Sequence, residues 1–244
     1  MDTQVPRDGA PRRAATSGSG HGRGYGPLWL SEFAATAVLL FAMVTLFRWL
    51  FAADSPLARA VPSADGRLLV DAVVSGAAVA LLIRSPFGRR SGAHMNPAVS
   101  VAFALLGALP GRAAAGYVAA QVAGSLTGVA IGRLVWGPAS GADPAAFAAI
   151  RPAAGVPLAL VAASEAAAAV VLLAAVTFVA ARPRWSRLLP AVAGVAVAGL
   201  IEAVGRWTGG SFNPARQFGP ELLAGDGRLL PVFLLAPLAG AGSF

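Results

Sequence analysis

The chain has 244 residues, of which 57% are hydrophobic and 12% charged, and its mean hydropathy is +0.68. A soluble domain carries about 25% charged residues, so this composition excludes a soluble protein and predicts an integral membrane protein without a sizeable soluble domain. Cysteine is absent and histidine is limited to His21 and His94, which excludes disulfides, thiolate chemistry and a histidine metal cluster. No metal or other cofactor is expected.

The net charge of +8 comes from arginine alone, since lysine is absent. The arginines lie in the N-terminal tail, in loops and at helix ends, a distribution that argues against nucleic-acid binding. Arginines are more frequent in the tail before the first apolar segment and in the loops predicted to lie on the same side of the membrane as that tail. The positive-inside rule then predicts a multi-pass protein of the cell (plasma or inner) membrane with a cytoplasmic N-terminus.

In chain order, residues 1–26 are rich in Gly, Arg, Ser and Pro and are expected to form a disordered cytoplasmic tail. Long apolar segments predict six spanning helices. They lie at about 28–51, 68–84, 113–136, 157–181, 188–205 and 229–244. The last corresponds to only about 24 Å of helix, less than the roughly 30 Å hydrocarbon core. Either the chain is truncated at Phe244 or this helix is short.

Two shorter apolar stretches, at about 97–107 and 214–224, each follow an Asn-Pro-Ala sequence. Asn is a strong N-cap and Pro suits the first helical position, so each sequence predicts a helix start. Neither helix could span a bilayer, and irregular backbone at membrane depth is tolerated only where it lines a cavity. The sequences Asn96-Pro97-Ala98 and Asn213-Pro214-Ala215 therefore predict a pore.

The segments fall into two halves, about 28–136 and 157–244, each with three spans and one half-helix. An odd number of spans makes the halves inverted repeats within one channel domain, 27–244. Glu32 and Glu165 lie early in the first span of each half. Two half-helix N-termini directed at one point would repel cations and favour a file of neutral hydroxyl-bearing molecules.

The loops SGAHMNPAVS and GGSFNPAR resemble the two signature loops of the major intrinsic proteins, the aquaporins and aquaglyceroporins. GYVAAQVAG in the third span, PLAGAG in the sixth, and Glu32 with Thr36 also match that family's pattern. The resemblance implies an all-α bundle of six transmembrane helices plus two re-entrant half-helices, one pore per subunit, and usually a homotetramer in membrane lipid.

The resemblance also implies a selectivity filter beyond the Asn pair. Ungapped counting assigns it to Gly76, Ile201, Gly210 and Arg216, with a one-residue shift open at the first two positions. Such a ring is wide and similar to that of nodulin-like intrinsic proteins. It implies passage of water, glycerol, urea and metalloid acids such as arsenious, boric or silicic acid. A water-selective aquaporin is the alternative.

Three further polar residues are expected to support the loops. His94 either fixes its loop or faces the pore, and the carboxyl groups of Glu32 and Glu165 either brace the half-helices or relay protons. Asp71 is expected to be solvated, and Glu202 to face a vestibule or pair with Arg206. No enzyme constellation is present. An ion- or proton-coupled transporter and an adhesive membrane protein with a closed pore are the competing functions.

Overall fold

The computed structural model describes residues 24–243, which form helices and loops and contain no strand. The predicted tail, residues 1–26, lies almost entirely outside the described residues. Within them, five helices are long and apolar enough to cross a membrane. They are α1 (Gly26–Phe51), α3 (Ala64–Arg84), α6 (Gly111–Trp136), α7 (Leu158–Ala180) and α8 (Leu189–Thr208).

A sixth apolar helix, α10 (Leu230–Gly242), has 13 residues and a length of about 20 Å. It occupies the place of the sixth predicted span. Shorter helices fill the connections between the spans. They are α2 (Pro56–Ala60), α4 (Pro86–Ser91), η1 (Gly137–Ser140), η2 (Ala146–Ala148) and η3 (Pro183–Leu188).

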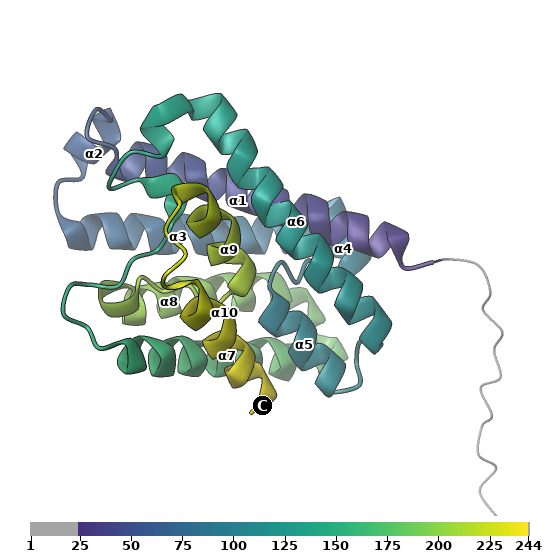
Figure 1. Ribbon diagram of the computed structural model, residues 1–244. Coiled ribbons are helices and arrows are strands. Elements are labelled where there is room, and N and C mark those ends of the chain that lie inside the picture. The colour runs from purple at the N-terminus through teal and green to yellow at the C-terminus, as the bar shows by residue number, and fades with distance from the viewer. Residues whose placement is uncertain (1–23, 244) are drawn as a thin grey trace, which may run out of the picture.

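The two predicted half-helices are α5 (Pro97–Leu105) and α9 (Pro214–Ala224). Figure 1 shows α1, α3, α7 and α8 running roughly side by side and α6 crossing them at an angle, with α5 and α9 as short segments beside α6. α1 and α7 each begin one half of the chain and run in opposite directions through the bundle. The architecture is therefore the expected all-α bundle with two re-entrant helices.

Small residues allow the helix backbones to come close together. A Cβ added at Gly124 of α6 would lie 2.5 Å from the carbonyl oxygen of Phe33 in α1. At Gly240 of α10, the same atom would lie 2.5 Å from the carbonyl oxygen of Ala166 in α7. The pairs α1–α6 and α7–α10 occupy equivalent places in the two halves, so the same type of contact holds each half together.

Candidate functional site

The loops that precede α5 and α9 share one backbone conformation. Positive φ angles occur at matching positions, at Gly92 (91°) and Gly209 (90°), Ala93 (45°) and Gly210 (69°), and Met95 (48°) and Phe212 (36°). A positive φ is costly for residues other than glycine and persists only where the surroundings impose it. The two halves therefore build the same strained approach to their half-helices, as an inverted repeat requires.

Each half-helix begins at the asparagine that the sequence predicts. The side-chain oxygen of Asn96 accepts the backbone N–H of Ala98 at 2.9 Å. That of Asn213 accepts the N–H groups of Ala215 at 3.0 Å and Arg216 at 3.3 Å. Pro97 and Pro214 occupy the first helical positions, where a missing N–H costs nothing.

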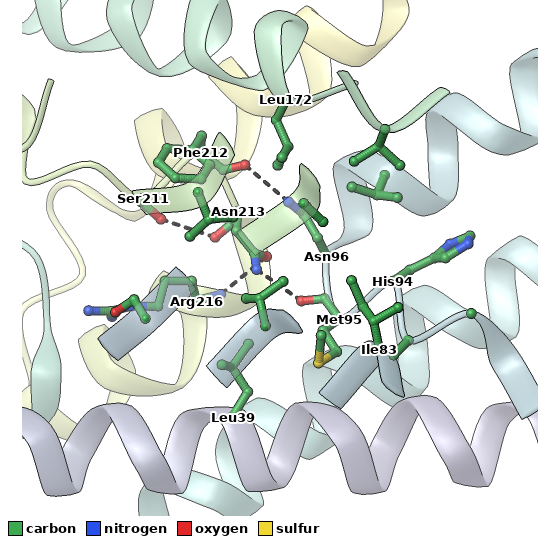
Figure 2. Close-up of a pocket in the computed structure, with 18 of the residues that line it drawn as sticks. Leu39, Ile83, His94, Met95, Asn96, Leu172, Ser211, Phe212, Asn213 and Arg216 are labelled. Atoms are coloured by element: carbon green, nitrogen blue, oxygen red, sulfur yellow. Dashed lines mark hydrogen bonds between the residues drawn. The ribbon is translucent and has the colours of Figure 1, made fainter. Parts of the chain in front are cut away.

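The two asparagines also bind each other's loops. Asn96 Nδ2 donates to the carbonyl oxygen of Phe212 at 3.2 Å, and Asn213 Nδ2 donates to that of Met95 at 2.9 Å. Figure 2 shows these reciprocal bonds at the centre of the site. An amide nitrogen has two N–H groups, so each side chain keeps one donor for a molecule in the adjoining cavity.

Two buried carboxyl groups hold the loops from behind. Glu32 accepts the backbone N–H groups of His94 at 3.0 Å and Met95 at 2.9 Å. In the other half, Glu165 accepts those of Ser211, at 3.2 Å, and Phe212. Both acids are fully buried. These are the contacts expected of bracing residues, and they satisfy the N–H groups that the strained loops would otherwise leave unpaired.

A cavity of about 180 Å³ passes both asparagines. It extends from Ile83, Ala180 and Leu189, on the side where α1 begins, to Ser75, Ile201 and Arg216, on the side where α1 ends. Most of its wall is aliphatic. Its polar lining residues are Ser75, His94, Asn96, Ser211, Asn213 and Arg216. Such a lining lets a small molecule slide along an apolar surface while a few polar groups orient it.

Arg216 lies at one end of this cavity and is 9% exposed. Its Nη1 donates to the carbonyl oxygen of Ala148 at 2.6 Å, and its guanidinium carbon lies 5.2 Å from the centre of the Phe47 ring. Ile201 and Gly210 line the cavity at the same end. Three of the four predicted filter positions therefore line the same cavity.

Gly76 is the exception, because it does not line the cavity. Its α-carbon faces α8, and a Cβ added to the opposing Gly194 would lie 2.6 Å from the Gly76 carbonyl oxygen. This close backbone contact sets the rotation of α3 and turns the preceding residue, Ser75, into the cavity. At this position Ser75, and not the predicted Gly76, lines the cavity, which is within the one-residue shift that the sequence leaves open.

The structure also corrects two expectations about charged residues. Asp71, expected to be solvated, is 7% exposed and accepts a hydrogen bond from Ser75. Arg206 pairs with Asp65 at 3.1 Å and not with Glu202.

His94 combines both of its proposed roles, since it lines the cavity and its Nδ1 lies 3.1 Å from Ser100 Oγ. Within residues 24–243, no three His, Asp or Glu side chains gather as a metal site would require.

Comparison with known proteins identifies relatives over nearly the whole chain. The family model described as major intrinsic protein matches residues 28–243. The probable aquaporin AqpM of Archaeoglobus fulgidus is 35% identical over 67% of this chain and 68% of its own length. The probable aquaporin NIP7-1 of Arabidopsis thaliana is 33% identical over 71% of this chain, and aquaporin NIP3-1 of Zea mays 34% over 86%.

The chain spans 61% and 65% of these two plant relatives, less than two thirds of each. Among solved structures, the X-ray structure of the aquaglyceroporin from Plasmodium falciparum has a TM-score of 0.73 at 22% identity. That alignment covers 89% of this chain and 93% of the other. At this identity, the likeness shows the fold alone.

Proposed function

The chain belongs to the major intrinsic protein family, and from that premise we propose that it is a passive membrane channel for water and small neutral solutes. The observation that carries this proposal is the crossed pair Asn96 and Asn213, which lines the cavity at the point where two half-helices begin. Both amide groups offer donors to an oxygen-bearing molecule there, and nothing in this arrangement requires an energy source.

Electrostatics explains how such a passage excludes cations. The N-terminus of a helix is equivalent to about half a positive charge, and α5 and α9 place two of them around the asparagines. Arg216 adds a full charge at one end of the cavity. A water or hydroxyl oxygen gains from these groups, whereas a cation is repelled. This opposes the competing reading of a cation-coupled transporter, and the chain has no expected enzyme activity.

The proposed filter is Ser75, Ile201, Gly210 and Arg216, which lie together at one end of the cavity. Ser75 and Gly210 are small, Ile201 is aliphatic, and Arg216 supplies N–H donors. A ring of these residues leaves room for solutes larger than water. We therefore favour glycerol, urea and metalloid acids, passing with some water, over a strictly water-selective channel. His94, Glu32 and Glu165 act as supports of the loops.

Other features follow from the family and from the arginine distribution. We propose a homotetramer embedded in the lipid of a plasma or inner membrane, with the N-terminus and the tail of residues 1–26 in the cytoplasm. The channel domain is 27–244, with repeats at about 28–136 and 157–244. The matching loop conformations before α5 and α9 support this division.

Reconstitution tests the proposal directly. Purified protein in liposomes is mixed with hyperosmotic solutions of glycerol, urea or an impermeant solute, and volume is followed by light scattering. We expect protein-dependent entry of water, glycerol and urea that a protonophore leaves unchanged. The variant Ser75→Trp should slow glycerol more than water because it fills the constriction. Absence of any protein-dependent flux, or strict dependence on a proton gradient, would overturn the proposal.

A further inference from the structure

A carboxyl group with spare hydrogen-bonding capacity lies one helical turn from the cavity-lining Ser75. Oδ1 of Asp71 accepts a bond of 2.9 Å from Ser75 Oγ. Its other oxygen, Oδ2, has no hydrogen-bond partner among residues 24–243, and it is not one of the fully enclosed atoms. An acidic residue within a membrane span is costly and is a candidate for function by default.

The two fully buried acids of the spans, Glu32 and Glu165, are already occupied. Glu32 accepts from two backbone N–H groups and from Gln121, and Glu165 from two backbone N–H groups and from Thr208. A carboxyl group has about four acceptor positions. Asp71 uses one of them within the described chain, so bracing of a loop does not account for it.

The helical spacing directs Asp71 towards the passage. Residues 71, 75 and 79 follow one another at intervals of four and therefore share a face of α3. Ser75 and Val79 line the cavity, and the backbone contact between Gly76 and Gly194 fixes this face inwards. Asp71 is not itself among the residues that line the cavity, and it lies one turn beyond Ser75 on this face, towards the side where α1 ends.

Asp71, one turn beyond Ser75 on α3, and Arg216, in the first turn of α9, both lie towards the side where α1 ends. They are nevertheless not a direct ion pair, because within the described residues no carboxyl oxygen lies within 4.0 Å of the Arg216 guanidinium. Arg216 gives one N–H to Ala148 and, as a guanidinium, has further donors. The end of the cavity therefore combines free donors on α9 with a free acceptor on α3.

We propose that Asp71 is a specificity-determining residue of the channel, which accepts a hydrogen bond from a solute whose oxygen is held by Arg216. Solutes that satisfy both groups are neutral molecules with at least two hydroxyl groups, and polyols are the matching class. This inference rests on the proposed function, because it names the solutes that the same constriction selects.

The test compares glycerol and water permeabilities of liposomes containing wild type, Asp71→Asn or Asp71→Glu. The amide is the same size as the carboxyl group but replaces one acceptor oxygen with a donor. A hydrogen bond to a charged group is worth about 1.5–3 kcal/mol, so we expect Asp71→Asn to lower the glycerol-to-water ratio about tenfold. Asp71→Glu, which keeps the carboxyl group, should retain most of it. The control Asp65→Asn, on the exposed start of α3, should leave the ratio unchanged.

A second measurement uses only the unaltered protein and so does not depend on the folding of a variant. Propan-1-ol is smaller than glycerol and has only one hydroxyl group, so it lacks the second hydroxyl that the proposal requires. After subtraction of the lipid background, we expect the channel to pass glycerol faster. A wild-type ratio in Asp71→Asn, or faster passage of propan-1-ol through the channel, would overturn the role of Asp71 while leaving the channel proposal intact. If wild type passes neither water nor solute, the proposed function itself fails.

Discussion

Asn96 donates a side-chain N–H to the carbonyl of Phe212, the residue before Asn213, at 3.2 Å. Asn213 in turn donates a side-chain N–H to the carbonyl of Met95, the residue before Asn96, at 2.9 Å. Asn96 and Asn213 are the only two asparagines in the chain. The oxygen of each amide caps its own half-helix, while the nitrogen holds the opposite loop. One side-chain type therefore performs the capping, joins the two halves and leaves donors for a solute. Neither a serine nor an aspartate cap offers this combination, because neither has an amide nitrogen.

Replacing Asn213 with alanine should cost both stability and flux. The substitution removes the cap of α9, which stabilises the protein by about 1–2 kcal/mol. It also leaves the Met95 carbonyl without its donor, which costs about 1–3 kcal/mol. We expect a lower unfolding temperature in detergent and reduced water flux in liposomes. Ser63→Ala is the matched control, since Ser63 caps α3 at an exposed position through one bond from Gly66. Equal effects of the two substitutions on flux would contradict a special role for Asn213.

Glu165→Gln tests the bracing of the second loop. Glutamine has the same shape, but its NH₂ group would face an N–H donor of Ser211 or Phe212, or the Thr208 hydroxyl. A buried donor left unsatisfied costs about 1–3 kcal/mol. We expect destabilisation of that order in thermal unfolding, and a similar value for Glu32→Gln. Asp54→Asn, which breaks an ion pair at a 64% exposed side chain, should cost less than about 1 kcal/mol. If all three substitutions cost the same, the buried carboxyl groups do not hold the loops.

Local chemistry made the half-helices predictable. Asn followed by Pro specifies a helix start through caps and fixed φ alone, and α5 and α9 begin at Pro97 and Pro214 as expected.

Residues whose position depends on tertiary packing were harder to predict. The rotation of α3 is set by the contact between Gly76 and Gly194, which are distant in sequence, and it places Ser75 rather than the predicted Gly76 in the cavity wall. The partner of Arg216 is the Ala148 carbonyl, presented by three successive residues with positive φ, Ala146 to Ala148. No sequence pattern marks that turn, because alanine and phenylalanine rarely adopt this conformation.

Gly76→Ala should destabilise the protein by perturbing the α3–α8 contact. The added methyl group would meet the Gly194 carbonyl oxygen, a backbone atom that cannot move aside cheaply. Overpacking of this kind costs about 1–3 kcal/mol. Gly199→Ala in the same helix pair is the control, because no atom lies within 4 Å of its added Cβ. It should be neutral or stabilising by up to about 1 kcal/mol. Thermal unfolding separates the two, and equal unfolding temperatures would contradict the close contact.

Asp226, in the loop between α9 and α10, should make stability depend on pH. Hydrogen bonds from Arg228, and then from Arg151, hold the pKa of its carboxyl group below the ordinary value of 3.8. A depressed pKa stabilises the folded state above the unfolded pKa, and that contribution is lost as pH falls. The difference in unfolding temperature between wild type and Asp226→Ala should therefore be largest near neutral pH and shrink below pH 3.8. Because Arg228 is exposed, 1 M salt should also reduce it. A difference independent of both pH and salt would refute this account.

Arg216→Ala should admit cations without closing the channel. The substitution removes a full positive charge at the end of the cavity and leaves the two half-helix termini as the remaining barrier. At an effective dielectric constant of about 20, a unit charge within about 12 Å contributes at least about 1.4 kcal/mol, so proton or sodium leak should rise about tenfold. Glycerol flux should persist because the opening widens.

A pH-sensitive dye and a potential-sensitive dye in the same liposomes measure the leak. Arg151→Ala, which removes an arginine paired with Asp226 outside the cavity lining, should leave it unchanged. An unchanged leak in Arg216→Ala would assign cation exclusion to α5 and α9 alone.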